Sequence, residues 1–193
     1  GHPDGIGALL KEASVFGLLT AISEIIVAAN HGETGSGIAI AGFGNFGLFF
    51  LAHIVMQWGG FYTHVFRFVV MGRATREIRD AHALVLEAEE NVLKRMTPGA
   101  ACADVFAAHN AFMREHRLPE EKRILCHGQG YEMVERPLIR QDETMTLREN
   151  MNMGLHAAMV VNGNFMSNTN NFLIGPHGPV RLHKTAQNLF ERD

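Results

Sequence analysis

The sequence is poor in cysteine and in clusters of like charge. Its two cysteines, Cys102 and Cys126, show no spacing typical of a disulfide framework, which favours reduced thiols and predicts a cytoplasmic protein. No block of Lys and Arg occurs, and the formal net charge is −3. A nucleic acid or an anionic membrane is therefore not expected as a partner. The first residues contain no basic stretch that leads into an apolar run, so no signal peptide is predicted.

Charged side chains are also missing from residues 34–66, and residues 38–58 are long enough to cross a bilayer. Clustered glycines, together with His53 and Gln57, interrupt this stretch. Strands that are buried on both faces also give continuous apolar runs. We therefore expect strands here rather than a transmembrane helix, and no association with a membrane.

Local patterns predict three helical regions among shorter strands. Apolar residues recur at three- and four-residue spacing, typical of amphipathic helices, over residues 6–30, 75–96 and 103–116. Thr75 is a suitable N-cap, and Pro98 and Gly99 end the helix that it begins. Strand-like composition marks residues 38–40, 48–57, 61–71, 145–147, 159–161 and 172–174. This order predicts a single α+β domain over residues 1–193, with a curved antiparallel sheet.

A histidine bordered by glycines is the strongest local signal for chemistry. In the segment CHGQGYEMVERP, residues 126–137, His127 is followed by Gly128 and Gly130. Glycine lets the backbone bend closely around a small ligand, and imidazole can act as an acid, a base or a metal ligand near neutral pH. A histidine that is hydrogen-bonded within a turn would give the same pattern, so the segment alone leaves both interpretations open.

The order of segments from residue 60 onward resembles the pita-bread hydrolases, the family of methionine aminopeptidases, prolidases and creatinase. GFYTHVFRFVVMG, residues 60–72, resembles the strand that precedes the long helix in that family. The family segment HGxGxE…E…P is matched by His127, Gly128, Gly130, Glu132, Glu135 and Pro137. LRENM, residues 147–151, and the closing segment 170–191 follow in the same order. The resemblance implies an α+β pita-bread fold.

The resemblance also implies a metal site, but most of its usual ligands are replaced in this sequence. Typical members bind two divalent cations through two Asp, one His and two Glu. The second Asp corresponds to His64, the His to His127, the first Glu to His156 and the last Glu to Thr169. The first Asp has no clear counterpart, with His53 the nearest position, and the proton-shuttling second histidine corresponds to Val134. The usual dinuclear centre is therefore not expected.

The first functional hypothesis is a hydrolase, similar to Xaa-Pro aminopeptidases and creatinase, that works without that centre. It would cleave a C–N bond in a small amide or peptide substrate, with His127 as general acid and base. The other expected catalytic residues are His64, Glu135 and His156. The expected substrate-binding residues are Tyr62, Arg67, Glu132, Thr169 and Asn170.

Two further hypotheses stay open. His64, His127 and His156 can converge on one Zn or Fe(II) ion, because three imidazoles with an open position make an acceptable site for either metal. Glu132 or Glu135 would then orient a ligating ring. Alternatively, the domain keeps its fold without catalysis and serves binding or assembly. Polar residues at the site positions favour retained function.

The resemblance also indicates a partner chain. By this resemblance we expect the sequence to correspond to the catalytic-type domain without the N-terminal accessory domain of prolidase- and creatinase-like proteins, which in those proteins often completes the site across a dimer. We therefore expect a homodimer.

Other polar residues are predicted at the surface or in turns. Five asparagines between residues 162 and 171 are typical of turns, although Asn170 corresponds to an Asp of the family's last strand. Solvent exposure is expected for His82, His109, His116 and His177.

Overall fold

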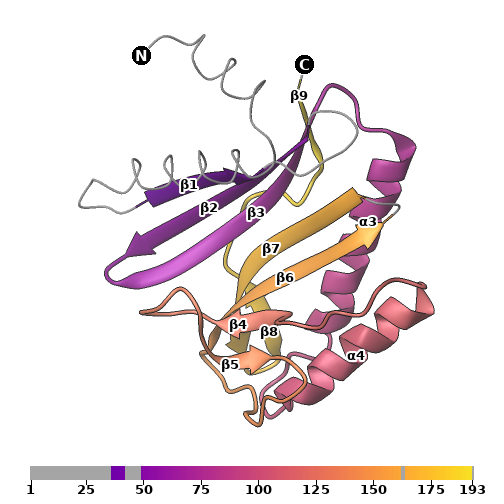
Figure 1. Ribbon diagram of the computed structural model, residues 1–193. Helices are drawn as coiled ribbons and strands as arrows, with labels where there is room; N and C mark the ends of the chain where they lie inside the picture. Colours follow the sequence, from indigo (N-terminus) through magenta and orange to yellow (C-terminus); the bar gives the residue numbers. More distant parts are fainter. Residues whose placement is uncertain (1–35, 42–48, 162–163, 193) are drawn as a thin grey trace.

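The computed structural model of the protein describes residues 36–41, 49–161 and 164–192 (Figure 1). Within these residues, two helices cover a sheet of nine strands. The helices are α3 (Arg76–Leu93) and α4 (Cys102–Glu115). The strands are β1 (Ser36–Ala41), β2 (Phe49–Trp58), β3 (Phe61–Met71), β4 (Cys126–Gly128), β5 (Glu135–Ile139), β6 (Asn152–Val161), β7 (Asn164–Gly175), β8 (Gly178–Arg181) and β9 (Phe190–Arg192).

The sheet joins two antiparallel groups of strands in the order β1-β2-β3-β7-β6-β4-β5. β3 and β7 pair at Phe66 and Thr169, which places the first group beside the second. β8 pairs with β7, and β9 runs parallel to the end of β3. Segments that are far apart in the sequence therefore meet at the centre of the sheet, where β3, β7 and β6 lie side by side (Figure 1).

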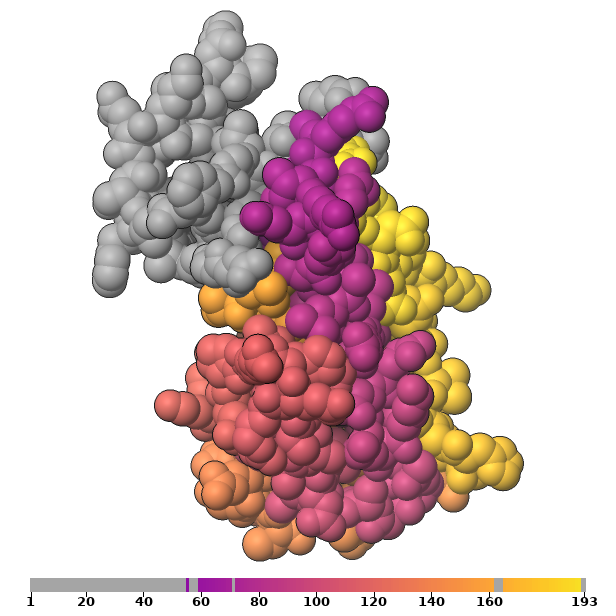
Figure 2. Space-filling view, turned by 90° about the vertical axis from the view of Figure 1, so that its right-hand side faces the viewer, coloured from indigo at the N-terminus to yellow at the C-terminus, as the bar shows by residue number. Residues whose placement is uncertain are grey.

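Both helices pack on one side of this sheet. α3 contacts β6 and β7, while α4 contacts α3 and β5. Figure 2 shows the two helices next to each other on the helical side of the molecule. Buried apolar residues recur every three or four positions along α3, at Ile78, Ala81, Val85, Ala88 and Val92. This spacing gives one apolar stripe that packs against the sheet, so the opposite face of the sheet is available for a site.

Most of the predicted elements are confirmed within the described residues. The strand at 61–71 is confirmed in full, and Thr75 caps α3 by accepting a hydrogen bond from the Ile78 amide at 3.3 Å. The short strand predicted at 145–147 is wrong, because its backbone pairs with the loop before α4 instead of a sheet strand: the Leu147 amide donates to Ala100. The helix predicted over 6–30 lies outside the described residues. None of the described helices is long and apolar enough to cross a membrane.

The asparagine-rich segment is a buried strand rather than a set of turns. Ser167, Asn168, Thr169, Asn170 and Asn171 follow one another along β7, and all five are buried. Because strand side chains alternate between the two faces, Asn168 and Asn170 point toward α3. There they donate to the carboxylate of Glu89 at 2.6 and 3.2 Å. The prediction of turns in this segment is therefore wrong, because the asparagine amides are hydrogen-bonded within the core.

Arg67 lies in the same buried layer and not at the surface or rim. Its guanidinium donates to Asn170 Oδ1 at 2.8 Å, to the Thr169 carbonyl at 3.0 Å and to the Ala186 carbonyl at 2.7 Å. Burial lowers the pKa of Arg67 to about 10, partly offset by the charge of Glu89. Burial likewise raises the pKa of Glu89, against the hydrogen bonds that it accepts. Arg67, the two asparagines and Glu89 therefore form a buried polar network, which we call the β7 core network.

Two histidines that were expected at the surface are buried, His82 and His109. His109 on α4 is 1% exposed, and neither of its ring nitrogens has a hydrogen-bond partner among the described residues. Burial lowers its pKa to about 4, although the nearby charge of Glu121 favours protonation. His109 is therefore a neutral imidazole in the core at pH 7.

Replacing the carboxylate of the β7 core network should destabilise the fold. Glu89→Gln leaves the buried charge of Arg67 without its counter-charge, and we expect a loss of about 3 kcal/mol in the free energy of unfolding. Urea denaturation at pH 7 measures this. Glu87→Gln, at an exposed position of the same helix, is the matched control and should change the free energy of unfolding by less than about 0.5 kcal/mol. Equal effects of both variants would contradict the proposed role of the network.

His109 should make the protein sensitive to acid. Its native pKa of about 4 lies below the ordinary value of 6.5, so below pH 6.5 the unfolded chain binds a proton that the native chain does not. The free energy of unfolding should therefore fall as the pH drops from 6.5 to 4. His109→Leu removes this loss, which amounts to about 2 kcal/mol at pH 5. Urea denaturation at pH 7 and pH 5 tests this prediction, with His177→Leu at an exposed position as the control. The prediction is refuted if wild type, His109→Leu and His177→Leu show the same pH dependence.

Candidate functional site

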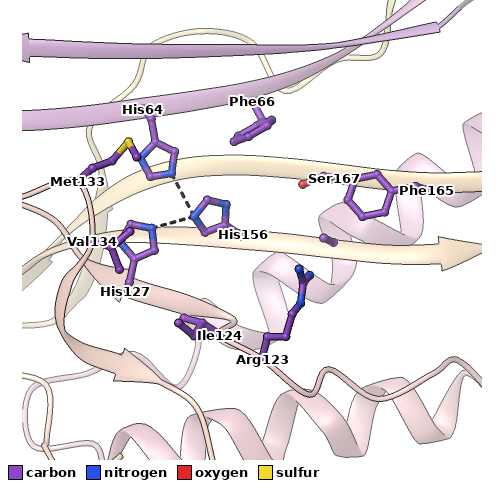
Figure 3. Close-up of a pocket in the computed structure, with 11 residues that line it drawn as sticks. His64, Phe66, Arg123, Ile124, His127, Met133, Val134, His156, Phe165 and Ser167 are labelled. Carbon is purple, nitrogen blue, oxygen red and sulfur yellow. Dashed lines mark hydrogen bonds between the residues drawn. The ribbon is translucent and has the colours of Figure 1, made fainter. Parts of the chain in front are cut away.

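Three histidines from three strands converge on the sheet face opposite the helices. His64 lies on β3, His127 on β4 and His156 on β6. The Nε2 atom of His156 lies 3.1 Å from that of His64 and 3.0 Å from that of His127 (Figure 3). One ligand nitrogen of each ring lies within 4.8 Å of the other two. The three rings therefore present their Nε2 atoms to one common point.

The register of the sheet explains this convergence. His127 pairs with Gly154 on β6, and His156 pairs with Thr169 on β7, which in turn pairs with Phe66 on β3. Because strand side chains alternate in direction, residues two apart share a face. His64 and Phe66 therefore line the same side of the sheet as His156. The three histidines are thus placed by long-range pairing and not by closeness in the sequence.

Gly154 gives the rings room to approach each other. It lies directly beneath them, and a Cβ atom at this position would be 2.7 Å from Cε1 of His64 and 3.2 Å from Cε1 of His127. Contacts this short force a ring to move. The absence of a side chain at Gly154 is therefore part of the site geometry.

The Nδ1 atom of each ring is held by a different partner. His127 Nδ1 donates to the Gly128 carbonyl at 2.8 Å. His156 Nδ1 lies 3.1 Å from the Thr169 hydroxyl, and His64 Nδ1 lies 2.9 Å from Oε1 of Gln129. These contacts fix the ring orientations, as outer partners do in histidine metal sites. Neither Glu132 nor Glu135, which were expected to orient a ring, is among these three partners.

A second set of hydrogen bonds assigns the amide of Gln129. Asn171 Nδ2 donates to Gln129 Oε1 at 2.7 Å, and Gln129 Nε2 donates to the Met133 carbonyl at 3.1 Å. Nε2 also lies 2.7 Å from His64 Nδ1, so that ring nitrogen can accept from Nε2 or donate to Oε1. When it donates, Nε2 of His64 carries a lone pair.

The Nε2 atoms of the three rings can share a proton or a metal cation. His127 directs an Nε2 lone pair at the Nε2 atom of His156, and His64 does the same when its Nδ1 donates to Gln129. At separations of about 3 Å, an Nε2–H of His156 or a metal cation stabilises these lone pairs. Burial lowers the pKa of His127, against its bond to the Gly128 carbonyl, which favours the neutral form that a metal binds. The three histidines can therefore hold a metal ion.

A pocket of about 410 Å³ opens over the cluster. Its walls are mainly apolar and include Phe66, Met133, Val134 and Phe165 (Figure 3). Val134, which takes the position of the family's second histidine, lines this pocket as an apolar side chain. Apart from the histidines, its polar lining residues are Arg123 and Ser167. A small, largely apolar molecule can therefore reach the three rings.

The other predicted site residues do not line this pocket. Glu132 is exposed and Glu135 half-buried, and the Glu132 amide donates to the Glu135 carboxylate at 2.7 Å within their own loop. Tyr62 meets that loop through its backbone, where its amide donates to the Gly130 carbonyl at 2.7 Å. Arg67 and Asn170 belong to the β7 core network. Thr169 does not line the pocket either, but its hydroxyl contacts a ring of the cluster, that of His156.

Sequence reasoning missed three residues that shape the site: Gln129, Gly154 and Asn171. Gln129 stands inside the CHGQG segment that drew attention to His127. Asn171 falls in the asparagine cluster, and its side chain accepts from the His64 amide at 2.9 Å. Gly154 had no local signal, because its importance comes from pairing with His127 across the sheet.

Comparisons with known proteins match this chain to a family of peptidases. The model of metallopeptidase family M24 matches residues 21–185. The Xaa-Pro dipeptidase of Pyrococcus horikoshii is 26% identical over 144 residues, which cover 70% of this chain and 40% of that protein. The chain thus spans about two fifths of the length of this curated relative.

Solved structures give the same result for the fold. The X-Pro aminopeptidase from Thermotoga maritima matches with a TM-score of 0.69 at 22% identity, over 74% of this chain and 41% of the other. The Xaa-Pro dipeptidase from Bacillus anthracis matches with a TM-score of 0.73 at 16% identity, over 90% of this chain and 54% of the other. The predicted α+β pita-bread fold is confirmed.

A side chain at Gly154 should disturb metal binding. Gly154→Ala pushes a methyl group against the His64 ring, and we expect roughly tenfold weaker binding of Zn²⁺. The stabilisation by saturating Zn²⁺ should then be about 1.4 kcal/mol smaller than in wild type. Thermal unfolding with and without Zn²⁺ measures this. Gly175→Ala, where a Cβ would meet the Gly178 carbonyl at 3.0 Å, is a control that should leave the Zn²⁺ response unchanged. An unchanged response in Gly154→Ala would contradict the site geometry.

Proposed function

This chain belongs to metallopeptidase family M24, and from that membership we propose that it is a hydrolase of small amides or peptides that binds one divalent metal ion, Zn²⁺ or Fe²⁺. His64, His127 and His156 would be its ligands. The observation that carries the proposal is the convergence of three Nε2 atoms whose rings are each held at Nδ1.

The donor set supports a single ion of borderline softness. Three neutral imidazoles suit Zn²⁺ or Fe²⁺, whereas carboxylate oxygens suit harder cations. In a tetrahedral zinc site the ligand nitrogens are about 3.3 Å apart. The separations of 3.0 and 3.1 Å from His156 are close to this value. Among the pocket-lining residues there is no carboxylate to bind a second ion.

The chain's own residues would orient the substrate and exclude water. A bound ion would supply Lewis acidity and a water of lowered pKa. Gln129, the Gly128 carbonyl and Thr169 keep the three rings fixed, so little reorganisation is needed during the reaction. The apolar walls, such as Phe66 and Val134, exclude bulk solvent and strengthen the electrostatic interactions in the pocket.

The same geometry also supports a reaction without metal. A proton shared between His156 and its two neighbours would let the cluster act as a general acid and base without a metal ion. His127 would then have the acid–base role expected from the sequence. In this version Glu135 would have a supporting role only through its loop. The measurement that separates the two versions is metal content.

Small peptides are the natural first substrates. The curated relative and both solved structures are named for action on Xaa-Pro peptides, which supports testing Ala-Pro. The homodimer and the cytoplasmic location predicted from the sequence belong to the same proposal.

The proposal is tested by measuring metal content and hydrolysis together. After dialysis against metal-free buffer, elemental mass spectrometry should find about one Zn or Fe per chain, bound by three ligands as in known zinc enzymes. His127→Ala should lose the metal, and its rate of Ala-Pro hydrolysis should fall roughly a hundredfold or more. Exposed His177→Ala is the control and should match wild type in both.

Each other outcome has a definite meaning. Hydrolysis that persists in metal-free protein but is lost in His127→Ala would establish the acid–base version. Folded protein that neither binds metal nor hydrolyses peptides would refute the proposal and leave a binding or assembly domain.

A further inference from the structure

His64 and His127 differ in the group that holds the Nδ1 atom of the ring. His127 donates from Nδ1 to the Gly128 carbonyl at 2.8 Å, and a carbonyl can only accept. The proton of that ring is therefore on Nδ1, and its Nε2 carries a lone pair that a metal can bind. His64 faces a side-chain amide instead, because its Nδ1 lies 2.9 Å from Oε1 and 2.7 Å from Nε2 of Gln129. This amide offers both an acceptor and a donor, so it influences which nitrogen of His64 carries the proton.

Backbone groups at both ends hold the Gln129 amide in one orientation. The His64 backbone N–H donates to Asn171 Oδ1 at 2.9 Å, so the NH2 group of Asn171 is the donor that faces Gln129. It donates to Gln129 Oε1 at 2.7 Å. At the other end, Nε2 of Gln129 donates to the Met133 carbonyl at 3.1 Å. The oxygen and the nitrogen of the amide are therefore distinguished by groups whose own roles are fixed.

Burial and backbone pairing keep Gln129 in this place. The residue is 3% exposed. Its backbone amide donates to the Asn152 carbonyl on β6, and its carbonyl accepts from the Asn152 side chain, both at 2.9 Å. The side chain cannot turn away from His64 without breaking buried hydrogen bonds, which is costly away from water. Gln129 therefore presents the same two amide atoms to His64 at all times.

Only one of the two tautomers of His64 suits a metal site. When Nδ1 of His64 donates to Oε1 of Gln129, the Nε2 atom of the ring carries the lone pair that a cation needs. When Nε2 of Gln129 donates to Nδ1 instead, the ring proton lies on Nε2, which faces His156 at 3.1 Å, and there it blocks a cation. The acceptor atom of Gln129 is therefore the part of this residue that favours metal binding.

From these contacts we propose that Gln129 is a positioning residue of the metal site. Its Oε1 atom keeps the proton of His64 on Nδ1, so that the Nε2 lone pair faces the ion. This inference rests on the metal version of the proposed function and adds to it a residue that does not touch the ion. A purely structural residue would act differently, because it would contribute only through its burial and its bond to Met133.

Two replacements of similar length separate the acceptor from the rest of the side chain. Gln129→Met removes both acceptor and donor, whereas Gln129→Glu removes the donor to the Met133 carbonyl but keeps an acceptor for His64. Competition of the full chain with a chromogenic chelator measures the dissociation constant for Zn²⁺. This constant should rise roughly ten- to a hundredfold in Gln129→Met. In Gln129→Glu it should equal the wild-type value or fall below it, because a carboxylate is the stronger acceptor.

The control is Gln141→Met, at an exposed position, which should bind Zn²⁺ as wild type does. Both Gln129 variants lose the bond to Met133, and only Gln129→Met loses the acceptor. Equal weakening of Zn²⁺ binding in the two variants would therefore overturn the inference and leave Gln129 as a structural residue.

The tautomer of His64 gives a readout that needs neither metal nor turnover. Long-range proton–nitrogen correlation NMR of the metal-free protein distinguishes the two tautomers, and the His64 signals are identified by their loss in His64→Gln. The fraction of His64 that is protonated at Nδ1 should increase from Gln129→Met through wild type to Gln129→Glu. The same fraction in all three folded proteins would contradict the role of Oε1.

The two proposals can fail separately. Zn²⁺ binding that follows the predicted order, without hydrolysis of Ala-Pro, refutes the hydrolase and leaves the role of Gln129 standing. Hydrolysis with bound metal, combined with equal weakening in both Gln129 variants, overturns the role of Gln129 alone. If wild type binds no Zn²⁺, the metal version of the proposed function and this inference both fail.

Discussion

Five consecutive polar side chains on β7 must all be satisfied away from water, and this requirement connects the core to the site. A buried polar group without a partner costs about 1–3 kcal/mol, so each one fixes its neighbours. The even-numbered residues, Asn168 and Asn170, bind Glu89 on α3. The odd-numbered residues Thr169 and Asn171 contact His156 and the His64 backbone on the opposite face. One strand therefore sets the position of a helix and of two candidate ligands at once.

The sequence predicts the features that depend on local pattern and on the order of segments. Strand-like composition predicts β3, and helical spacing predicts α3 with its start at Thr75. The family resemblance predicts that His64, His127 and His156 lie together. Partners set by cross-strand register are different. Gln129, and not Glu132 or Glu135, reaches His64, because strand register and the Asn171 amide decide which side chain arrives. Composition gives no information about such pairing.

Burial is the other property that composition predicts poorly. His109 and Arg67 are polar residues for which solvent or a rim is the ordinary environment, yet both are buried. Arg67 is compensated by carbonyls and asparagines that lie a hundred or more residues away in the sequence. His109 has no such compensation in the described residues and stays neutral instead. Both solutions depend on tertiary contacts, which no short window of sequence contains.

The shared strand has a consequence for how the site responds to change in the core. The Arg67 guanidinium donates to the carbonyl of Thr169, and the hydroxyl of the same residue contacts His156. A change in the core network that displaces Thr169 should therefore also displace the His156 ring, because only this one residue separates them. Ligand geometry tolerates displacements of about half an ångström before affinity falls. The core network and the histidine cluster are thus joined through Thr169, so the polar core helps to hold the His156 ring in position.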